Sequence, residues 1–351
     1  MKKRYSILFI LAIAMLSIGA TGCNIKTKDT QTDGGFFAST DFGENWKQKV
    51  FVSQEKSGVR TISSVGTEKM VFDPNDARIL YLLTTGSGIY KTINKGEQWY
   101  ATGLASGTYV DLSIDHRNSN VLYVTQGTKI LKSVDAGKTW HDIYIETRAG
   151  QKLVAVAVTP EHPDTVYAAS TSSMLKSTDY GNTWKLLEWK EPLIKKIFIS
   201  EKNVNTLFAL TTAGLFKSAD AAATWTDITI ALKQFKGARS IAWIDFNPTT
   251  ERILLGTSYG ILRSTDVGQN WTEIPTLFDF KKVTISTVIE HPDNPDRILF
   301  ATKNIIQKTI DGGRTWKTLK TVPTGRTINF LINDPETPDS VYLGTKLPPQ
   351  K

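Results

Sequence analysis

The chain has 351 residues, of which 40% are hydrophobic, 22% charged and 10% aromatic. This composition is typical of a globular protein and excludes a disordered or collagen-like chain. The formal net charge is +8, of which three positive charges lie in the first four residues, and no cluster of Lys and Arg interleaved with aromatic residues follows. These features exclude a nucleic-acid-binding protein.

The first 23 residues have the features of an export signal. Lys2, Lys3 and Arg4 precede an apolar run over residues 7–20, and small residues then lead to Cys23, the single cysteine. The run is shorter than the roughly twenty residues of a transmembrane helix. It resembles a bacterial lipoprotein signal, whose cysteine carries the lipid. We expect a signal over residues 1–23, a polar tether over 24–33, and a membrane-anchored lipoprotein on the extracytoplasmic side, in the periplasm or at the cell surface.

Seven related acidic segments follow along the chain, for example "SVDAGKTW" at 133–140 and "STDYGNTW" at 177–184. The successive tryptophans that end them are 53, 41, 44, 41, 46 and 45 residues apart. They are Trp46, Trp99, Trp140, Trp184, Trp225, Trp271 and Trp316. A period of about 40–50 residues with strand-like content is typical of a β-propeller.

A second motif alternates with the first, for example "FDPNDARILY" at 72–81 and "NDPETPDSVY" at 333–342. Each copy has an apolar run, a turn rich in Pro, Asp and Asn, and a β-branched or aromatic run, which predicts strand, turn, strand. A third strand precedes each acidic segment and a fourth begins at its tryptophan. Each repeat therefore has the four strands of one propeller blade.

The ends of the repeat region predict how the ring closes. The region begins with the last two strands of a blade, at "GGFFAS" and "NWKQKVFV", and finishes with the first two strands of another, at "TINFLIN" and "SVYLGT". Pairing these halves would complete a seventh blade and remove the exposed sheet edges. We therefore predict one all-β domain over residues 34–351, a seven-bladed β-propeller closed by its N-terminal and C-terminal half-blades.

The acidic segment suits a hairpin between the third and fourth strands. Gly137 can adopt a positive φ, Asp135 can accept hydrogen bonds from the turn, and Trp140 can bury its ring between blades. The pattern S-x-D-x-G-x-T-W is identified as the Asp-box, or bacterial neuraminidase repeat. The equivalent aspartates are Asp41, Asp135, Asp179, Asp220, Asp266 and Asp311. Asn94 and Ala222 depart from the pattern, so we expect strained or differently shaped hairpins there.

The Asp-box resemblance extends over nearly all of residues 34–345. Such repeats occur in sialidases, in xyloglucanase-type glycoside hydrolases, in the sortilin propeller and in photosystem II assembly factors. The resemblance implies a propeller fold and a structural role for the boxes, away from the catalytic face. It does not specify a function, because one fold carries many functions.

We expect a ligand to bind at the opposite end of the channel from the boxes. There the fourth strand of each blade connects to the next blade, and six of the seven connecting loops end in a basic residue. Converging loops would form a basic ring for a carboxylate, a phosphate or an acidic peptide, although solvated strand ends are an alternative explanation. The candidate ligand-binding residues are Arg60, Tyr109, Arg148, Lys196, Arg239, Lys282 and Arg326.

A glycosidase is the alternative. Tyr109 and Glu146 with several arginines supply the residue types of a sialidase, but the Arg-Ile-Pro signature of those enzymes is absent. A xyloglucanase-type enzyme needs two carboxylates, for which the candidates are Asp111, Asp245 and Glu290. The four histidines are too scattered to ligate a metal.

We therefore interpret the chain as a lipid-anchored, non-enzymatic binding or assembly scaffold. We expect a monomer with a protein, peptide or glycan partner and without metal or other cofactor. A sialidase-type or xyloglucanase-type glycoside hydrolase, or a glycan-binding lectin, is the alternative function.

Overall fold

The structure is a computed structural model that describes residues 33–280, 282–320 and 322–347. The expected signal with its lipidation site Cys23, and the expected tether up to residue 32, lie outside the described residues. Within the described ranges, no helix is long and apolar enough to cross a membrane.

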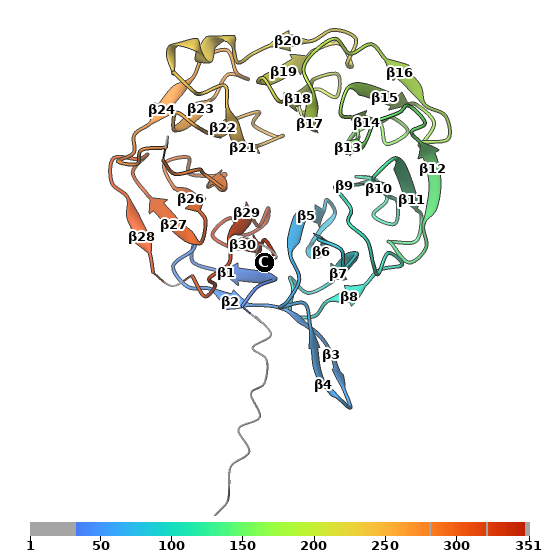
Figure 1. Cartoon of the computed structure of the whole chain (residues 1–351), viewed down its shortest axis with the longest axis horizontal. Helices are drawn as coiled ribbons and strands as arrows, with labels where there is room; N and C mark the ends of the chain where they lie inside the picture. Colours follow the sequence, from blue (N-terminus) through green and yellow to red (C-terminus); the bar gives the residue numbers. More distant parts are fainter. Residues whose placement is uncertain (1–32, 281, 321, 348–351) are drawn as a thin grey trace, which may run out of the picture. The chain divides into compact units, whose positions relative to one another are not determined.

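Seven four-stranded antiparallel sheets stand around a central channel as the blades of a propeller (Figure 1). Blades 1 and 2 consist of β5 (Thr67–Asp73), β6 (Asp76–Thr84), β7 (Ile89–Thr92) and β8 (Tyr100–Ala101), then β9 (Asp111–Ile114), β10 (Leu122–Gln126), β11 (Lys129–Ser133) and β12 (His141–Ile145). Blades 3 and 4 consist of β13 (Leu153–Val158), β14 (Val166–Ser170), β15 (Ser173–Ser177) and β16 (Lys185–Leu187), then β17 (Ile194–Ile199), β18 (Leu207–Thr211), β19 (Leu215–Ser218) and β20 (Thr226–Asp227). Blades 5 and 6 consist of β21 (Ile241–Phe246), β22 (Ile253–Thr257), β23 (Ile261–Ser264) and β24 (Thr272–Ile274), then β25 (Thr287–Glu290), β26 (Ile298–Thr302), β27 (Ile305–Thr309) and β28 (Lys317–Leu319). A short 3₁₀ helix, η1 (Ile230–Gln234), lies between blades 4 and 5.

Blade 7 closes the ring as the sequence predicts. It contains β29 (Ile328–Asn333) and β30 (Val341–Thr345) from the end of the described chain, followed by β1 (Phe36–Ser39) and β2 (Lys47–Gln48) from its start. β1 pairs antiparallel with β30 over four residues, and the Phe36 ring stacks on that of Tyr342 at 5.4 Å. The prediction of an all-β, seven-bladed propeller is therefore confirmed.

One strand prediction is wrong. The fourth strand of blade 7 was expected over "NWKQKVFV", but β2 contains only two residues, and Phe51–Glu55 forms β3, which pairs with β4 (Gly58–Thr61). This hairpin projects outward from the ring (Figure 1). Gly58, at φ +130°, follows a turn that is short enough for β3 to pair with the residues directly after it.

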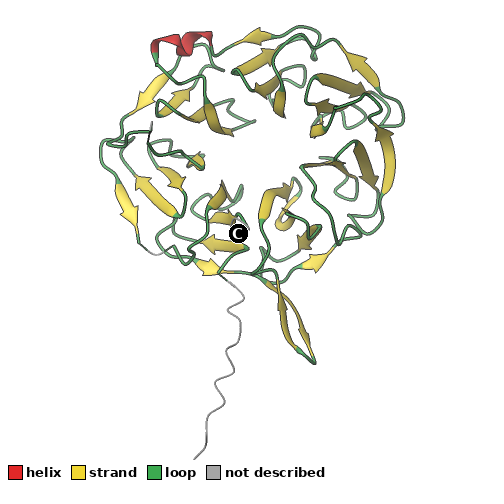
Figure 2. Ribbon diagram, viewed as in Figure 1, coloured by secondary structure: helices red, strands yellow, loops and turns green. Residues whose placement is uncertain are grey.

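The blades pack against one another through their second strands. β14, β18, β22, β26 and β30 are each buried at all five positions. Apolar side chains therefore cover both faces of these strands, which explains why their sequences are nearly continuous apolar runs rather than alternating ones. The strands and loops form a ring around its centre (Figure 2).

The antiparallel order gives the channel two chemically different ends. The turn face carries the turns between the first and second strands of each blade and the seven acidic hairpins between the third and fourth strands. The loop face carries the connections between blades and those between the second and third strands. These two names are used below.

Hydrogen bonds within each acidic hairpin fix its shape. In blade 3, the Asp179 carboxylate accepts from the Ser177 hydroxyl at 2.7 Å and from the Thr183 amide and hydroxyl at 2.8 and 2.6 Å. The Gly181 amide donates to the Ser177 hydroxyl at 2.8 Å. The bonds from Thr183 lower the pKa of Asp179 to about 2, so the carboxylate is ionised at neutral pH. Equivalent bonds are made by Asp41, Asp135, Asp220, Asp266 and Asp311.

The tryptophans lie at the ends of these hairpins, directly before the fourth strands. Trp99 is fully buried, and its indole donates to the backbone carbonyl of Lys49 at 2.9 Å. The indole of Trp316 donates to the Pro275 carbonyl at 2.8 Å. Both bonds reach the outer connection that leaves the preceding blade, so these rings join neighbouring blades. The remaining indoles are buried or partly buried: Trp46, Trp140, Trp184, Trp225 and Trp271.

The two departing hairpins keep the shape of the others. Asn94 accepts from Thr92 and from the Gln98 amide at 2.8 and 3.0 Å, as the aspartates do. The expected difference in shape is therefore wrong. Strain is present at Ala221 and Ala222, whose φ angles are +59° and +70°, because the left-handed region costs an alanine roughly 1–2 kcal/mol.

We predict that Ala221→Gly stabilises the protein by about 0.5–1 kcal/mol, because glycine removes the left-handed strain but adds freedom to the unfolded chain. Ala223→Gly is the matched control. Ala223 is exposed, lies two residues further on and has no positive φ, so its replacement should destabilise the protein. The free energy of unfolding, measured with denaturant, distinguishes the two variants, and equal destabilisation by both would contradict the strain at Ala221.

Candidate functional site

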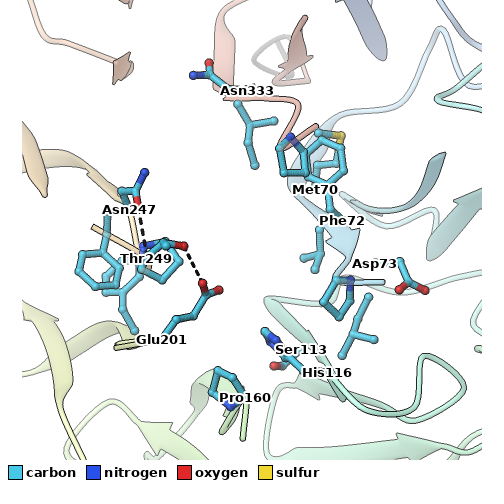
Figure 3. Close-up of a pocket in the computed structure, with 18 of the residues that line it drawn as sticks. Met70, Phe72, Asp73, Ser113, His116, Pro160, Glu201, Asn247, Thr249 and Asn333 are labelled. Atoms are coloured by element: carbon cyan, nitrogen blue, oxygen red, sulfur yellow. Dashed lines mark hydrogen bonds between the residues drawn. The ribbon is translucent and has the colours of Figure 1, made fainter. Parts of the chain in front are cut away.

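The central channel contains a cavity of about 1090 Å³. First strands from all seven blades line it, and it extends from the middle of these strands to the turn face. Met70, Phe72 and Asn333 face Asn247 and Thr249 across the opening (Figure 3). The wall is thus partly apolar, with amide and hydroxyl groups near the mouth.

The cavity opens at the turn face, to which the sequence assigns only a structural role. The first turns are short and leave the channel uncovered. Two connections on the loop face instead send side chains into the cores between blades, where Leu232, Ala238, Phe280 and Ile285 are buried. These two connections therefore pack against the blades, whereas the sequence predicts loops that converge over the channel.

Side chains of the first strands satisfy the free backbone edge of the neighbouring first strand. Asp111 accepts from the Val156 amide at 3.0 Å, and Asp245 accepts from the Glu290 amide at 3.1 Å. Buried amides at a sheet edge need such acceptors, because an unpaired one is costly. The Ser113 and Thr287 hydroxyls accept in the same way from the Val158 and Leu331 amides. The side-chain amides of Asn329 and Asn333 instead donate to the backbone carbonyls of Thr67 and Glu290.

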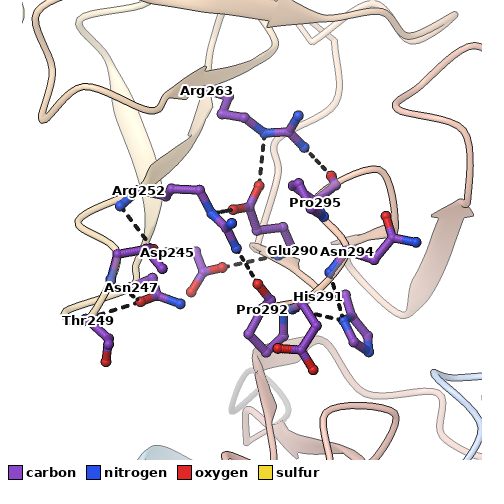
Figure 4. Close-up of polar contacts among 12 residues, drawn as sticks. Asp245, Asn247, Thr249, Arg252, Arg263, Glu290, His291, Pro292, Asn294 and Pro295 are labelled. Carbon is purple, nitrogen blue, oxygen red and sulfur yellow. Dashed lines mark hydrogen bonds and ion pairs between the residues drawn. The ribbon is translucent and has the colours of Figure 1, made fainter.

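The carboxylates that a hydrolase would use are engaged in such contacts. Asp111 also accepts from the Leu112 amide at 3.0 Å and forms an ion pair with Lys69. Glu290 is buried and forms ion pairs with Arg252 at 2.7 Å and Arg263 at 2.8 Å (Figure 4). These contacts keep both groups in fixed positions within the blade walls.

Asp245 differs from these carboxylates, because no ion pair to it occurs among the described residues. Burial, partly offset by the bond from the Glu290 amide and reinforced by the Glu290 charge, raises the pKa of Asp245 to about 7. Its side chain lines the cavity and is partly exposed. Asp245 is therefore a carboxyl group that holds a proton close to neutral pH and faces the channel.

Five of the seven candidate ligand-binding residues are engaged elsewhere in the fold. Three form ion pairs, one is buried between blades, and one lies on the projecting hairpin. Arg148 pairs with Glu146 at 2.5 Å, Arg239 with Asp227 at 2.7 Å and Lys282 with Asp279 at 3.7 Å. The pairs of Arg148 and Lys282 each lie within one connection, and the pair of Arg239 ties a connection to β20 of blade 4. Tyr109 is buried in the core between blades 1 and 2 and donates to the Ser106 carbonyl at 3.1 Å, and Arg60 lies on the projecting β3–β4 hairpin.

Arg326 is also used within the fold. It is buried and pairs with Asp33 at 3.3 Å, and it donates to the backbone carbonyls of Ser64 and Val65. It therefore joins the start of the described chain to the blade 7 connection. Glu146, the base that a sialidase-like site would need, is buried against Arg148, whose hydrogen bonds lower the pKa of Glu146.

Lys196 is the candidate whose ammonium forms no ion pair among the described residues. Its Nζ lies 4.6 Å from the centre of the Trp243 ring on β21. Desolvation and repulsion by Lys69, partly offset by the charge of Asp111, lower the pKa of Lys196 to about 8. A cation held against an aromatic ring and repelled by a second cation favours an incoming anion.

Trp243 and the arginines that hold Glu290 are not among the site residues predicted from the sequence. Trp243 is one of two tryptophans outside the acidic segments, in the predicted first strand "IAWIDF", and that position was the available signal. Arg252 and Arg263 lie in segments that read as ordinary strand ends, so nothing in the sequence points to their shared partner. No group of three or more His, Cys, Asp and Glu side chains in the described ranges could hold a metal ion.

Comparisons with known proteins identify the fold and not a family. No family model and no curated protein matches the chain. Among solved structures, it is similar to YCF48 bound to a D1 peptide, with a TM-score of 0.61, 13% identity and coverage of 80% of this chain and 94% of the other. YCF48 from Cyanidioschyzon merolae has a TM-score of 0.61, 16% identity and coverage of 80% and 96%.

A glycoside hydrolase is equally similar in fold. The GH74 enzyme of Niastella koreensis has a TM-score of 0.61, 16% identity and coverage of 88% of this chain and 53% of the other. The chain thus spans about half the length of that enzyme. At these identities the similarity shows a seven-bladed propeller, and it leaves open whether the chain binds a partner or catalyses a reaction.

We predict that Asp245→Asn changes the pH dependence of stability. The carboxyl pKa is about 7 in the folded protein and about 4 in the unfolded chain, so ionisation is disfavoured in the fold and stability falls as pH rises from about 4 to 7. Asparagine can accept the same amide bond without a charge. The difference in the free energy of unfolding between the variant and the unmodified protein should therefore increase by about 1–2 kcal/mol from pH 5 to pH 8. Water in the channel screens the charge and keeps this value below that for a fully buried group.

Asp179→Asn is the control for this experiment. The pKa of Asp179 lies near 2 in the fold and near 4 in the unfolded chain, so the group is ionised in both states above pH 5. Its substitution should change stability by the same amount at pH 5 and pH 8. A constant difference for Asp245→Asn as well would contradict the raised pKa of Asp245.

Proposed function

We propose that this protein is a non-enzymatic binding propeller that holds an anionic segment of a protein or peptide partner at the loop-face end of its channel. The observation that carries the proposal is the Lys196 ammonium, which lies against Trp243 and forms no ion pair among the described residues, while Asp111, the carboxylate that acts on it, is itself paired with Lys69. A carboxylate on the partner would complete this site with a charge-assisted hydrogen bond.

Other cations surround the proposed contact. Lys69 lies close enough to repel Lys196, and its own ion pair with Asp111 compensates only that one charge. Lys152 and Lys195 are exposed at or directly before the first strands of blades 3 and 4. An anionic segment reaching into the channel would therefore meet several positive charges before it reached Lys196.

The fold comparison supports a peptide or protein as the partner. YCF48 has the same propeller fold and is described in complex with a D1 peptide, so a propeller of this shape can receive a peptide. The identity of 13% extends this argument to the kind of ligand and not to a particular sequence.

A glycosidase is the second candidate because of Asp245. A carboxyl that holds its proton near pH 7 and faces the cavity has the property of a general acid in glycoside hydrolysis. The second carboxylate that such an enzyme needs is harder to supply, since Asp111 and Glu290 are paired with basic residues. Hydrolysis of a fluorogenic sialoside or glucan that Asp245→Asn abolishes would overturn the binding proposal.

We further propose that the propeller is attached to an extracytoplasmic membrane surface through a lipid on Cys23. The support comes from the sequence of residues 1–23, with its basic start, its short apolar run and its cysteine. A tethered scaffold would work close to its partner without catalysing a reaction.

We predict that an oligoglutamate peptide binds the protein and that its oligoglutamine counterpart does not. Lys196→Gln should weaken binding about tenfold or more, as expected for the loss of a hydrogen bond to a charged group of about 1.5–3 kcal/mol. Fluorescence anisotropy with labelled peptides measures both results.

Lys138→Gln is the matched control, because Lys138 is exposed in the acidic hairpin of blade 2 on the turn face. The control removes the same charge and should leave the affinity unchanged. Equal binding of the two peptides, or an equal loss in both variants, would contradict a specific anion site in the channel.

We predict that Cys23→Ser moves the protein from the membrane fraction to the soluble fraction, or leaves an uncleaved precursor. Metabolic labelling with a fatty-acid analogue should mark the unmodified protein and not the variant. Label incorporation that persists in Cys23→Ser would contradict lipidation at this residue.

A further inference from the structure

Apolar side chains protrude from the loop face between blades 4 and 6. Leu277 is 97% exposed, and Ile230, at the start of η1, is 52% exposed. Nearby, Tyr259 and Phe278 line a small pocket of about 190 Å³. A nearly fully exposed leucine beside partly exposed aromatic rings gives this face an unusually apolar patch.

The loop around Leu277 is held in place, so the exposure is a feature of the fold. Phe280 is buried, and its ring lies 5.8 Å from that of Phe300 in blade 6. The Phe278 ring also contacts Phe300, at 5.3 Å. Two anchors directly after Leu277 therefore keep the leucine at the tip of a supported loop instead of allowing it to fold inward.

Lysines flank this patch, whose acidic neighbours are Asp279, which pairs with Lys282, and Glu273, which accepts from the Tyr259 hydroxyl. Lys233 and Lys236 are exposed in the connection that carries η1, and neither has an ion pair among the described residues. Over the whole loop face, lysines without such a pair outnumber comparable glutamates. The lysines include Lys152, Lys195, Lys196, Lys233, Lys236 and Lys303, and the glutamates are Glu68, Glu191 and Glu273.

The described chain also starts on this face. Asp33 pairs with Arg326 and accepts from the Gly325 amide at 2.9 Å, and both partners belong to the connection between β28 and β29. Cys23 is ten residues earlier in the sequence. A fully extended chain of ten residues spans about 35 Å, so a lipid on Cys23 would keep Asp33 within that distance of the bilayer.

We propose that the loop face docks on an anionic lipid bilayer through the patch of Ile230, Leu277 and Phe278 and the lysines Lys233 and Lys236. Protruding aliphatic tips with lysines around them suit the boundary between headgroups and acyl chains, where both kinds of group are stabilised. An acidic protein would match the lysines but would not explain single aliphatic side chains at the tips of separate loops.

This docking would determine which partner segments can reach the Lys196 site. Lys196 lies near the loop-face end of β17, so the partner segment would be one that lies close to the membrane. The distance argument rests on the proposed lipid at Cys23, whereas the exposed side chains and the lysines do not depend on it.

The test places an environment-sensitive NBD fluorophore at the tip. Leu277→Cys is labelled in the full chain with Cys23→Ser, so that the label is at a single site and no lipid anchor is present. Vesicles containing phosphatidylglycerol should shift the emission to the blue and raise it severalfold, and a quencher attached to the acyl chains should reduce it. Vesicles of phosphatidylcholine alone, or high salt, should give little change.

Val134→Cys provides the matched label on the turn face, where Val134 is 58% exposed in the acidic hairpin of blade 2. Its emission should not change, although the N-terminal segment is the same in both proteins. Lys233→Glu with Lys236→Glu should abolish the response at residue 277, and Lys138→Glu with Lys185→Glu on the turn face and rim should not.

Three outcomes would overturn the proposal. They are an equal response at both labels, no response at residue 277, and a response to soluble oligoglutamate without quenching from the acyl chains, which would favour an acidic protein. The result is independent of the peptide-binding test of Lys196, which is made in solution without vesicles. Failure of one proposal is therefore distinguishable from failure of the other.

Discussion

The pairing of β1 with β30 is the contact on which the rest of the structure depends. It joins strands about three hundred residues apart in the sequence, through Phe36, Ala38 and their partners. Without it, the ring would have two open sheet edges and the first strands would not surround a channel. The Phe36 ring extends this closure to blade 1, because it lies 5.0 Å from the Trp99 ring.

A closed ring creates a second requirement at its centre. Each first strand presents a free backbone edge to the channel, and at several of the described junctions a side chain of the neighbouring first strand supplies a missing partner. Asp111 and Asp245 do so with carboxylates, while Ser113 and Thr287 do so with hydroxyls. Acidic residues near a propeller axis can thus be explained by hydrogen bonding within the fold, which weakens the argument for a hydrolase.

The same consideration applies to the basic residues. Arg148, Arg239 and Arg326 each pair with an acidic group in or beside their own connection, so they stabilise loops. Lys196 differs because it lies against Trp243 and near Lys69, and the carboxylate that acts on it, Asp111, is paired with Lys69. The proposed anion site therefore depends on one cation that forms no ion pair among the described residues and not on the number of cations near the channel.

The sequence by itself determined the number of blades, the half-blade closure and the hairpins, because these follow from periodic local patterns such as those ending at Trp140 and Trp184. It also predicted Lys196 as a ligand-binding residue, together with six residues that the fold places in ion pairs, in the core or on the projecting hairpin. Only the tertiary structure decided which charges are paired, since Glu290 meets Arg252 and Arg263, and Lys196 meets Trp243, across gaps of 27 to 47 residues. Periodicity specifies strands and turns, whereas the pairing of side chains depends on distances that exist only once neighbouring blades have packed.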